Sequence, residues 1–388
     1  MERTELNAWL RLTLTPGIGN ETARKLLAAF GSATAVFEQS ADSLRQLGSE
    51  KLSRVVREEP PTLAALLQTT LDWLAAGDDR HLVTLGDTGY PPSLLNIEDP
   101  PLMLYMLGQH VKRGLVAIEN VANNIAVVGS RNPTPQGEDN ARQFAKAFGG
   151  AGLCVVSGLA LGVDGAAHDG ALLASHLPGS CATIAVVGTG LDRVYPKKHL
   201  ALAHRIAQQG MIISEFPLGT PPLIANFPRR NRLISGLSQG VLVVEAALKS
   251  GSLITARLAV EQGKEVFAIP GSIHSPQSRG CHMLIKQGAK LVETAQDVFE
   301  ELKVSPSQMA ARTTLLPAHP DNMQEGVNPS MPGHALLSAL GFDVTSLDTL
   351  QARTGMATAQ LLGQLLELEL DGHVARLPGG LFQRTALG

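Results

Sequence analysis

With 388 residues, 44% of them hydrophobic, the chain is long enough for two or three domains and a large buried core. The net charge of −3 does not describe a globally basic protein, and 39 glycines with 23 prolines indicate many turns. No apolar run reaches the roughly 20 residues of a membrane span, and Met1–Leu14 lacks a signal-peptide pattern. The three cysteines are few and far apart, which indicates reduced thiols in the cytoplasm rather than disulfides or a zinc site.

The charge is unevenly distributed along the chain. Residues 120–300 hold 16 Lys/Arg against 12 Asp/Glu, and the remaining residues hold 16 against 23. The middle of the chain is therefore mildly basic and its flanks are acidic. Global charge neither supports nor excludes a nucleic-acid partner, so a local basic patch has to carry that argument.

Residues 1–76 are expected to form a helical domain. Within it, Leu12–Ser32 contains Pro-Gly-Ile-Gly followed by a helical pattern, which is the turn of a helix-hairpin-helix or SAM-like unit. The amides of such a turn can bind a phosphate, but a single turn in an acidic segment favours a tight turn without any DNA contact. The proline-punctuated stretch Thr84–Leu107 leads into the main domain and could add a strand, and Gln109–Asn124 is a polar spacer.

Residues 80–302 are expected to form an extended Rossmann-like domain. Short apolar runs alternate with stretches of helical spacing such as Gly137–Phe148 and Leu253–Gln262. This alternation predicts right-handed βαβ units and a doubly wound, mostly parallel sheet. The predicted strands are Ile125–Ser130, Leu153–Gly158, Thr183–Gly188, Met211–Glu215, Gly240–Ala246, Glu265–Pro270 and Lys290–Glu293.

The C-terminal part divides into a linker and a small domain. Residues 303–333 are rich in Pro, Ser, Asn and Met without periodicity, which predicts a flexible linker. Residues 334–388 show a helix capped by Ser346, a second helix, and two strands around Pro378-Gly379-Gly380, the layout of a winged helix. The second helix, Thr358–Asp371, has no Lys or Arg, which favours a protein–protein module over a DNA reader.

The stretch Asn226–Ala256 places basic residues beside a buried strand. It is interpreted as a basic loop with Arg229, Arg230 and Arg232, a short helix, the strand Gly240–Ala246, and a small-residue turn into a second helix. Carboxyl ends of parallel strands and helix N-termini are where α/β sheets bind anions. Three guanidiniums within four residues at such an edge predict a polyanionic ligand.

The other strand ends supply small residues, hydroxyls and cations, but hardly a nucleophile with its base. Asp164 and His168 could act in catalysis or hold a metal, yet a pair that braces the loop is the more common arrangement. Glu245 is interpreted as an ion-pair organiser rather than a general base, and Tyr195 beside two lysines could stack a base.

The candidate single-stranded-DNA contacts are Gly129, Ser130, Arg131, Lys197, Lys198, Arg229, Arg230, Asn231, Arg232, Lys249, Ser250, Gly251 and Ser252. Supporting residues of the pocket are Ser157, Gly158, Asp164, His168, Glu245 and Gly271. No cofactor and no metal are expected.

Together these motifs resemble the DNA-processing protein A family (DprA, also called Smf). The resemblance covers nearly the whole chain and is carried by GYPPSLL, DPPLMLY, VVGSR, SGLALGVDGAAHDGAL, AVVGTGLDRVYPKKH, FPRRNRLISGLS, KSGSLITA and VFAIPGSIHSPQSRGCHMLIKQGA. It implies a basic pocket for single-stranded DNA, contacted by Arg131, Lys197 or Lys198, Arg230 and Lys249. It also implies a homodimer that loads the recombinase RecA in natural transformation and relieves inhibition by single-strand-binding protein, without turnover.

Two departures from the family pattern stand out. Leu161 replaces the arginine of SGLARGID, which removes a cation from the pocket rim, and the spacer Gln109–Asn124 is longer than usual. Two alternative functions remain open. A Rossmann-like nucleotide or phosphoribosyl hydrolase would carry PGGxGTxxE where this chain reads KSGSLITA, without the catalytic glutamate. A protein-interaction scaffold would leave the three-arginine cluster unexplained.

Overall fold

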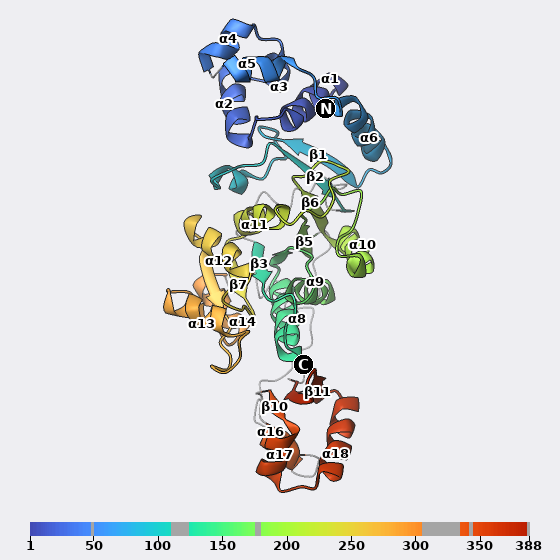
Figure 1. The fold of residues 1–388 in the computed structure, drawn as a ribbon, viewed down its shortest axis with the longest axis vertical. Helices are drawn as coiled ribbons and strands as arrows, with labels where there is room; N and C mark the ends of the chain where they lie inside the picture. Colours follow the sequence, from blue (N-terminus) through green and yellow to red (C-terminus); the bar gives the residue numbers. More distant parts are fainter. Residues whose placement is uncertain (48–49, 110–123, 175–179, 305–333, 341–343, 386–388) are drawn as a thin grey trace.

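The computed structural model describes residues 1–47, 50–109, 124–174, 180–304, 334–340 and 344–385. Figure 1 shows a helical N-terminal part, a central sheet with helices on both faces, and a small C-terminal domain arranged along the long axis. Within the described ranges, no helix combines the length and the apolar character needed to cross a lipid bilayer. The predicted spacer and linker fall almost entirely on residues 110–123 and 305–333, which lie outside the described residues.

The N-terminal part is helical, as the sequence predicts. The turn between its first two helices contains Gly17 at φ +83°, a left-handed conformation that favours glycine. The helices are α1 (Arg3–Leu14), α2 (Asn20–Phe30), α3 (Ala33–Phe37), α4 (Ala41–Leu47), α5 (Glu50–Arg57) and α6 (Leu63–Ala75).

The central sheet has the order β1-β2-β6-β5-β4-β3-β7-β8-β9, and all pairs from β6 to β9 are parallel. All seven predicted strands are present: β3 (Asn124–Val128), β4 (Cys154–Ser157), β5 (Thr183–Val186), β6 (Met211–Ser214), β7 (Gly240–Val243), β8 (Glu265–Ala268) and β9 (Lys290–Leu291). The stretch Thr84–Leu107, expected to add a strand, contributes β2 (Met103–Leu107), and the residues leading into it form β1 (Arg80–Thr84). The two strands pair antiparallel with each other and extend the sheet beyond β6.

Helices cover both faces of the sheet because successive strand residues point in opposite directions. Ile125 and Val127 of β3 pack in one hydrophobic cluster with α8 (Pro135–Gly150), α9 (Val163–Leu173) and α14 (Ala295–Glu301). Ala126 and Val128 pack in another with α11 (Asn226–Gly236), α12 (Ser252–Glu261) and α13 (Arg279–Lys286). Helix α10 (Leu200–Gln209) packs beside β5 and β6. The doubly wound architecture predicted from the sequence is confirmed.

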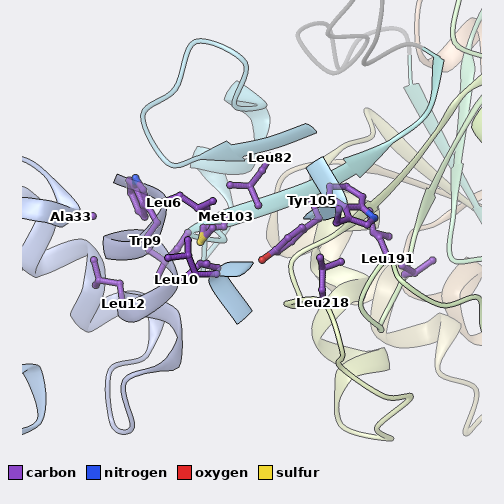
Figure 2. Packing of buried hydrophobic residues seen from close by; sticks show 14 of the residues in the cluster. Leu6, Trp9, Leu10, Leu12, Ala33, Leu82, Met103, Tyr105, Leu191 and Leu218 are labelled. Carbon is purple, nitrogen blue, oxygen red and sulfur yellow. The ribbon is translucent and has the colours of Figure 1, made fainter. Parts of the chain in front are cut away.

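The N-terminal helices share a core with the added edge of the sheet. Figure 2 shows Trp9 and Leu10 of α1 packed near Met103 and Tyr105 of β2, all of them buried. The same cluster continues to Leu218 beyond β6. The N-terminal part is therefore fixed to the sheet by apolar packing as well as by the chain connection.

The C-terminal domain is a winged helix, as predicted. Helices α16 (His334–Leu340), α17 (Leu347–Thr354) and α18 (Thr358–Leu370) pack with strands β10 (Thr345–Ser346), β11 (Val374–Leu377) and β12 (Leu381–Arg384). Ser346 caps α17 by accepting a hydrogen bond from the amide of Thr349. Leu362, Leu366 and Leu370 of α18 are exposed.

The stretch Asn226–Ala256 differs from its prediction in one respect. The three arginines do not lie in a loop, because α11 already begins at Asn226. Pro228 lies in the first turn of this helix, where the backbone N–H that proline lacks has no intrahelical acceptor. Pro228 is therefore compatible with a helix that begins at Asn226 and is no sign of a loop.

Candidate functional site

A hollow of about 650 Å³ lies at the point where the strand order in the sheet reverses, between β3 and β7. From β3 the sheet continues through β4 to one side and through β7 to the other, so the loops after β3 and β7 diverge. Open α/β sheets bind ligands at this switch point. Residues 128–132 after β3, residues 247–255 around the start of α12, and one face of α11 line the hollow.

The loop after β3 brings a hydroxyl and an exposed cation to the hollow. The hydroxyl of Ser130 accepts a hydrogen bond from the amide of Asn132 at 3.1 Å, which fixes the turn. Arg131 is exposed, and its guanidinium carbon lies 5.6 Å from the ring centroid of Phe227. Gly129 lets the loop after β3 lie close to the start of α9, because a Cβ at Gly129 would lie only 2.7 Å from the side chain of Val163.

Arg230 is the buried cation of the hollow. Only 4% of the residue is exposed, and its Nη1 donates to the carbonyl oxygen of Val186 at 2.5 Å. Gly158 makes room for it, since a Cβ at Gly158 would overlap the guanidinium. Burial lowers the pKa of Arg230 to about 10, opposed by Asp164, so the side chain is cationic at neutral pH.

Asp164 braces the loop after β4, as the more common of the two interpretations expects. Its carboxylate accepts hydrogen bonds from the amides of Gly158 and Ala160 at 3.1 and 3.4 Å. Burial raises the pKa of Asp164, and the charge of Arg230 acts in the opposite direction. The expected pairing with His168 is replaced by these contacts, so Asp164 orders the backbone rather than a catalytic histidine.

Helix α11 separates the three arginines. Residues three apart on a helix share a face, whereas the residue between them points about 100° away. Arg230 therefore faces the hollow, while Arg229 and Arg232 lie on another side of the helix, near Phe216 and Glu215. Arg232 donates to Glu215 at 2.5 Å and is 8% exposed, so it does not line the hollow. The predicted cluster of three arginines is thus one pocket residue and two residues outside the pocket.

The loop after β7 supplies a cation and the N-terminus of α12. Lys249 is exposed and lines the hollow with Ser250, Gly251 and Ser252. The hydroxyls of Ser250 and Ser252 lie 2.7 Å apart, and the side-chain amide of Asn231 donates to the carbonyl oxygen of Gly251 at 3.4 Å. The first three amides of α12 donate to the turn before the helix: Ser252 to the hydroxyl of Ser250, and Leu253 and Ile254 to the carbonyl oxygens of Ser250 and Gly251. The positive end of the helix dipole is therefore what this end offers to an anion.

Two aromatic rings form one wall of the hollow. The ring centroids of Tyr195 and Phe227 lie 5.7 Å apart, and 46% of Tyr195 is exposed. Lys197 and Lys198 follow Tyr195 in an exposed turn and do not line the hollow. Phe227 was not among the predicted site residues, although its place two residues before the first arginine of FPRRNR was the available signal.

The remaining supporting residues have structural partners. Glu245 is not an ion-pair organiser, because its carboxylate accepts from the amide of Thr134 at 2.9 Å and from its hydroxyl at 2.6 Å. His168 is fully buried, and its Nδ1 lies 2.7 Å from the hydroxyl of Thr183. Since that hydroxyl donates to the carbonyl oxygen of Val155, Nδ1 carries the proton. Burial lowers the pKa of His168 to about 3.

Ser157 and Gly271 also lie outside the hollow. The hydroxyl of Ser157 donates to the carbonyl oxygen of Val127, which ties β4 to β3, and Gly271 lies against the ring of His282. Among the residues that the structure describes, no three His, Cys, Asp or Glu side chains are grouped so as to hold a metal ion.

The family model of DNA recombination-mediator protein A matches residues 81–303, and that of the DprA winged helix domain matches residues 324–380. The chain belongs to the DprA/Smf family.

Relatives of known name support this membership. Protein Smf of Escherichia coli is 43% identical over 320 residues, covering 81% of this chain and 80% of that protein. DNA processing protein DprA of Bacillus subtilis is 38% identical over 272 residues, or 68% and 87% of the two chains. The X-ray structure of DprA from Streptococcus pneumoniae matches with a TM-score of 0.59 and 34% identity, over 78% of this chain and 98% of that one. A structure of DprA from Helicobacter pylori, described for its single-stranded DNA binding mode, matches with a TM-score of 0.50 and 31% identity over 57% and 96%.

Proposed function

We propose that the chain binds single-stranded DNA in the switch-point hollow and acts as a recombination mediator without turnover. The observation that carries the proposal is the charge balance of the hollow. Arg131 and Lys249 are exposed there, and neither has a carboxylate partner in the described part of the chain. Unpaired cations at a concave site attract a polyanion, and each phosphate they neutralise releases a counterion.

The preference for a single strand follows from the shape and lining of the hollow. Backbone phosphates would lie against Arg131, Lys249 and the positive end of α12, while an unstacked base would pack on Phe227 and Tyr195. Base–aromatic stacking accepts any base, so binding would depend little on sequence. A base in a duplex is paired and stacked and cannot enter the hollow without the cost of leaving the helix. The described binding mode of the Helicobacter pylori relative supports the same ligand.

The wider role is proposed from family membership. The mediator would act as a homodimer that protects incoming single strands, loads RecA onto them in natural transformation, and relieves inhibition by single-strand-binding protein. The winged helix would serve protein–protein contacts, because α18 carries exposed leucines and no Lys or Arg. Sedimentation with and without an oligonucleotide measures whether the chain forms a homodimer. RecA filament assembly on single strands covered by single-strand-binding protein measures RecA loading and the relief of inhibition.

The first test is a fluorescence-anisotropy titration of a labelled oligo-dT strand and of a duplex of equal length, each at two salt concentrations. We expect salt-sensitive binding of the single strand and much weaker binding of the duplex. Equal affinity for the two, or no binding at all, would refute the proposal. Nucleotide hydrolysis, assayed in the same preparations, would then test whether the cations form a site for a small phosphate.

A further inference from the structure

Helix α11 has a second face that is turned away from the hollow and carries a buried ion pair. Arg232 on this face donates through Nη2 to Oε2 of Glu215 at 2.5 Å, and the side chain of Glu215 is only 6% exposed. Burial raises the pKa of Glu215, and the positive charge of Arg232 counteracts that rise. A buried pair of this kind is costly to break, since either partner would be left as an uncompensated charge.

A second carboxylate links this pair to the N-terminal domain. Oδ2 of Asp99 lies 3.6 Å from Nη2 of Arg232. The same carboxylate accepts hydrogen bonds from two side chains of α2, Asn20 and Arg24, each at 2.9 Å. Nη1 of Arg24 also donates to the carbonyl oxygen of Pro100 at 3.0 Å. Asp99 is thus shared between a helix of the N-terminal domain and the helix that lines the hollow.

The loop that carries Asp99 also packs tightly on α11. A Cβ at Gly236, the last residue of α11, would lie 2.8 Å from Cγ2 of Ile97 and 2.9 Å from Cδ2 of Leu94. No side chain fits between the loop and the helix at this point. The N-terminal domain is in turn fixed to the sheet by the core that Figure 2 shows. These contacts connect α2 to α11 through a single loop.

We propose that Arg24 and Asp99 are positioning residues through which the N-terminal domain sets the affinity of the hollow for single-stranded DNA. This inference rests on the proposed function of the hollow. Helix α11 is a single unbroken helix, so a shift at Arg232 is shared by Phe227 and Arg230 on its other face. The N-terminal domain then regulates DNA binding without contacting the strand.

The substitution Arg24→Gln tests the proposal, because it removes the charge on the N-terminal side and leaves Asp99, Arg232 and Glu215 in place. Arg24→Lys is the rescue variant: one nitrogen of Arg24 makes both contacts, so a single ammonium can replace it. Lys25→Ala is the matched control, since Lys25 lies on the same helix and its ion-pair partner among the described residues is Glu21 at the surface. Single-strand affinity is measured by anisotropy across a salt series, and folding by thermal unfolding.

We expect Arg24→Gln to weaken single-strand binding roughly threefold or more, with an unchanged salt slope, while Arg24→Lys and Lys25→Ala remain close to wild type. Unchanged affinity together with a lowered Tm would overturn the inference, because the contact would then only stabilise the fold. A reduced salt slope would also overturn it, because Arg24 would then contact a phosphate directly. If wild type binds the single strand and Lys249→Ala weakens that binding, the proposed function stands even when the results for Arg24→Gln overturn this inference. If wild type does not bind, both proposals fail.

Discussion

Removing Lys249 should change the salt dependence of DNA binding by a predictable amount. Lys249 is exposed, lines the hollow, and has no ion-pair partner among the described residues, so Lys249→Ala should leave the fold intact. One phosphate contact to a single strand contributes about 0.7 to the slope of log K against log salt. At about 0.1 M salt this amounts to about a fivefold loss of affinity, or about 1 kcal/mol, and the loss should disappear near 1 M.

The assay is an anisotropy titration of a labelled oligo-dT at four or more salt concentrations. Lys146→Ala is the matched control, because Lys146 is an exposed lysine on α8 that does not line the hollow. We expect its line to coincide with that of wild type, whereas the Lys249→Ala line should be shallower and converge at high salt. Parallel lines for Lys249→Ala and wild type would refute a phosphate contact at this residue. Equal losses in both variants would show that only net charge matters.

Three further predictions concern the wall, the buried arginine and the buried histidine. Phe227→Ala should weaken single-strand binding by roughly 1–3 kcal/mol without changing the salt slope, measured by the same titration. Gly158→Ala places a Cβ where the Arg230 guanidinium lies and should destabilise the fold by roughly 1–3 kcal/mol in urea unfolding, whereas Gly150→Ala, with open space around it, should not. The pKa of His168 is lowered to about 3 in the folded protein, so between pH 6.5 and 3 the unfolded chain binds a proton that the folded chain does not. The free energy of unfolding should therefore decrease as the pH is lowered through this window, by up to about 1.4 kcal/mol per pH unit. In urea unfolding at pH 7 and pH 5, His168→Gln should lose less stability between the two pH values than wild type.

The sheet could be predicted because its signals are local. Buried parallel strands appear as short apolar runs, and all seven predicted runs contain a strand. The pair β1 and β2 was expected as one strand at most, because the prolines between them resemble an irregular entry segment. Their strand character depends on pairing with β6 and on packing against α1, and neither contact is visible in the local sequence.

Which of the predicted arginines line the hollow depends on where α11 begins. Three arginines within four residues appear as a single patch when they are placed in a loop. Once α11 begins at Asn226, the helical rotation directs Arg230 to the hollow and Arg232 to Glu215. Phe227 was overlooked for the same reason, since its orientation toward Tyr195 and Arg131 exists only when the helix is in place.

The carboxylates at the edge of the sheet explain why a chain with a net negative charge presents a cationic hollow. Oδ2 of Asp164 accepts from two loop amides, and both oxygens of Glu245 accept from Thr134. A carboxylate whose lone pairs are engaged in this way contributes less negative potential to the cavity and is not free to take a proton from a ligand. The same contacts hold the loop after β3, which carries Arg131, and the loop after β4, against which the Arg230 guanidinium lies. Negative charge inside the protein therefore orders the loops, while the cations that remain unpaired define what the hollow attracts.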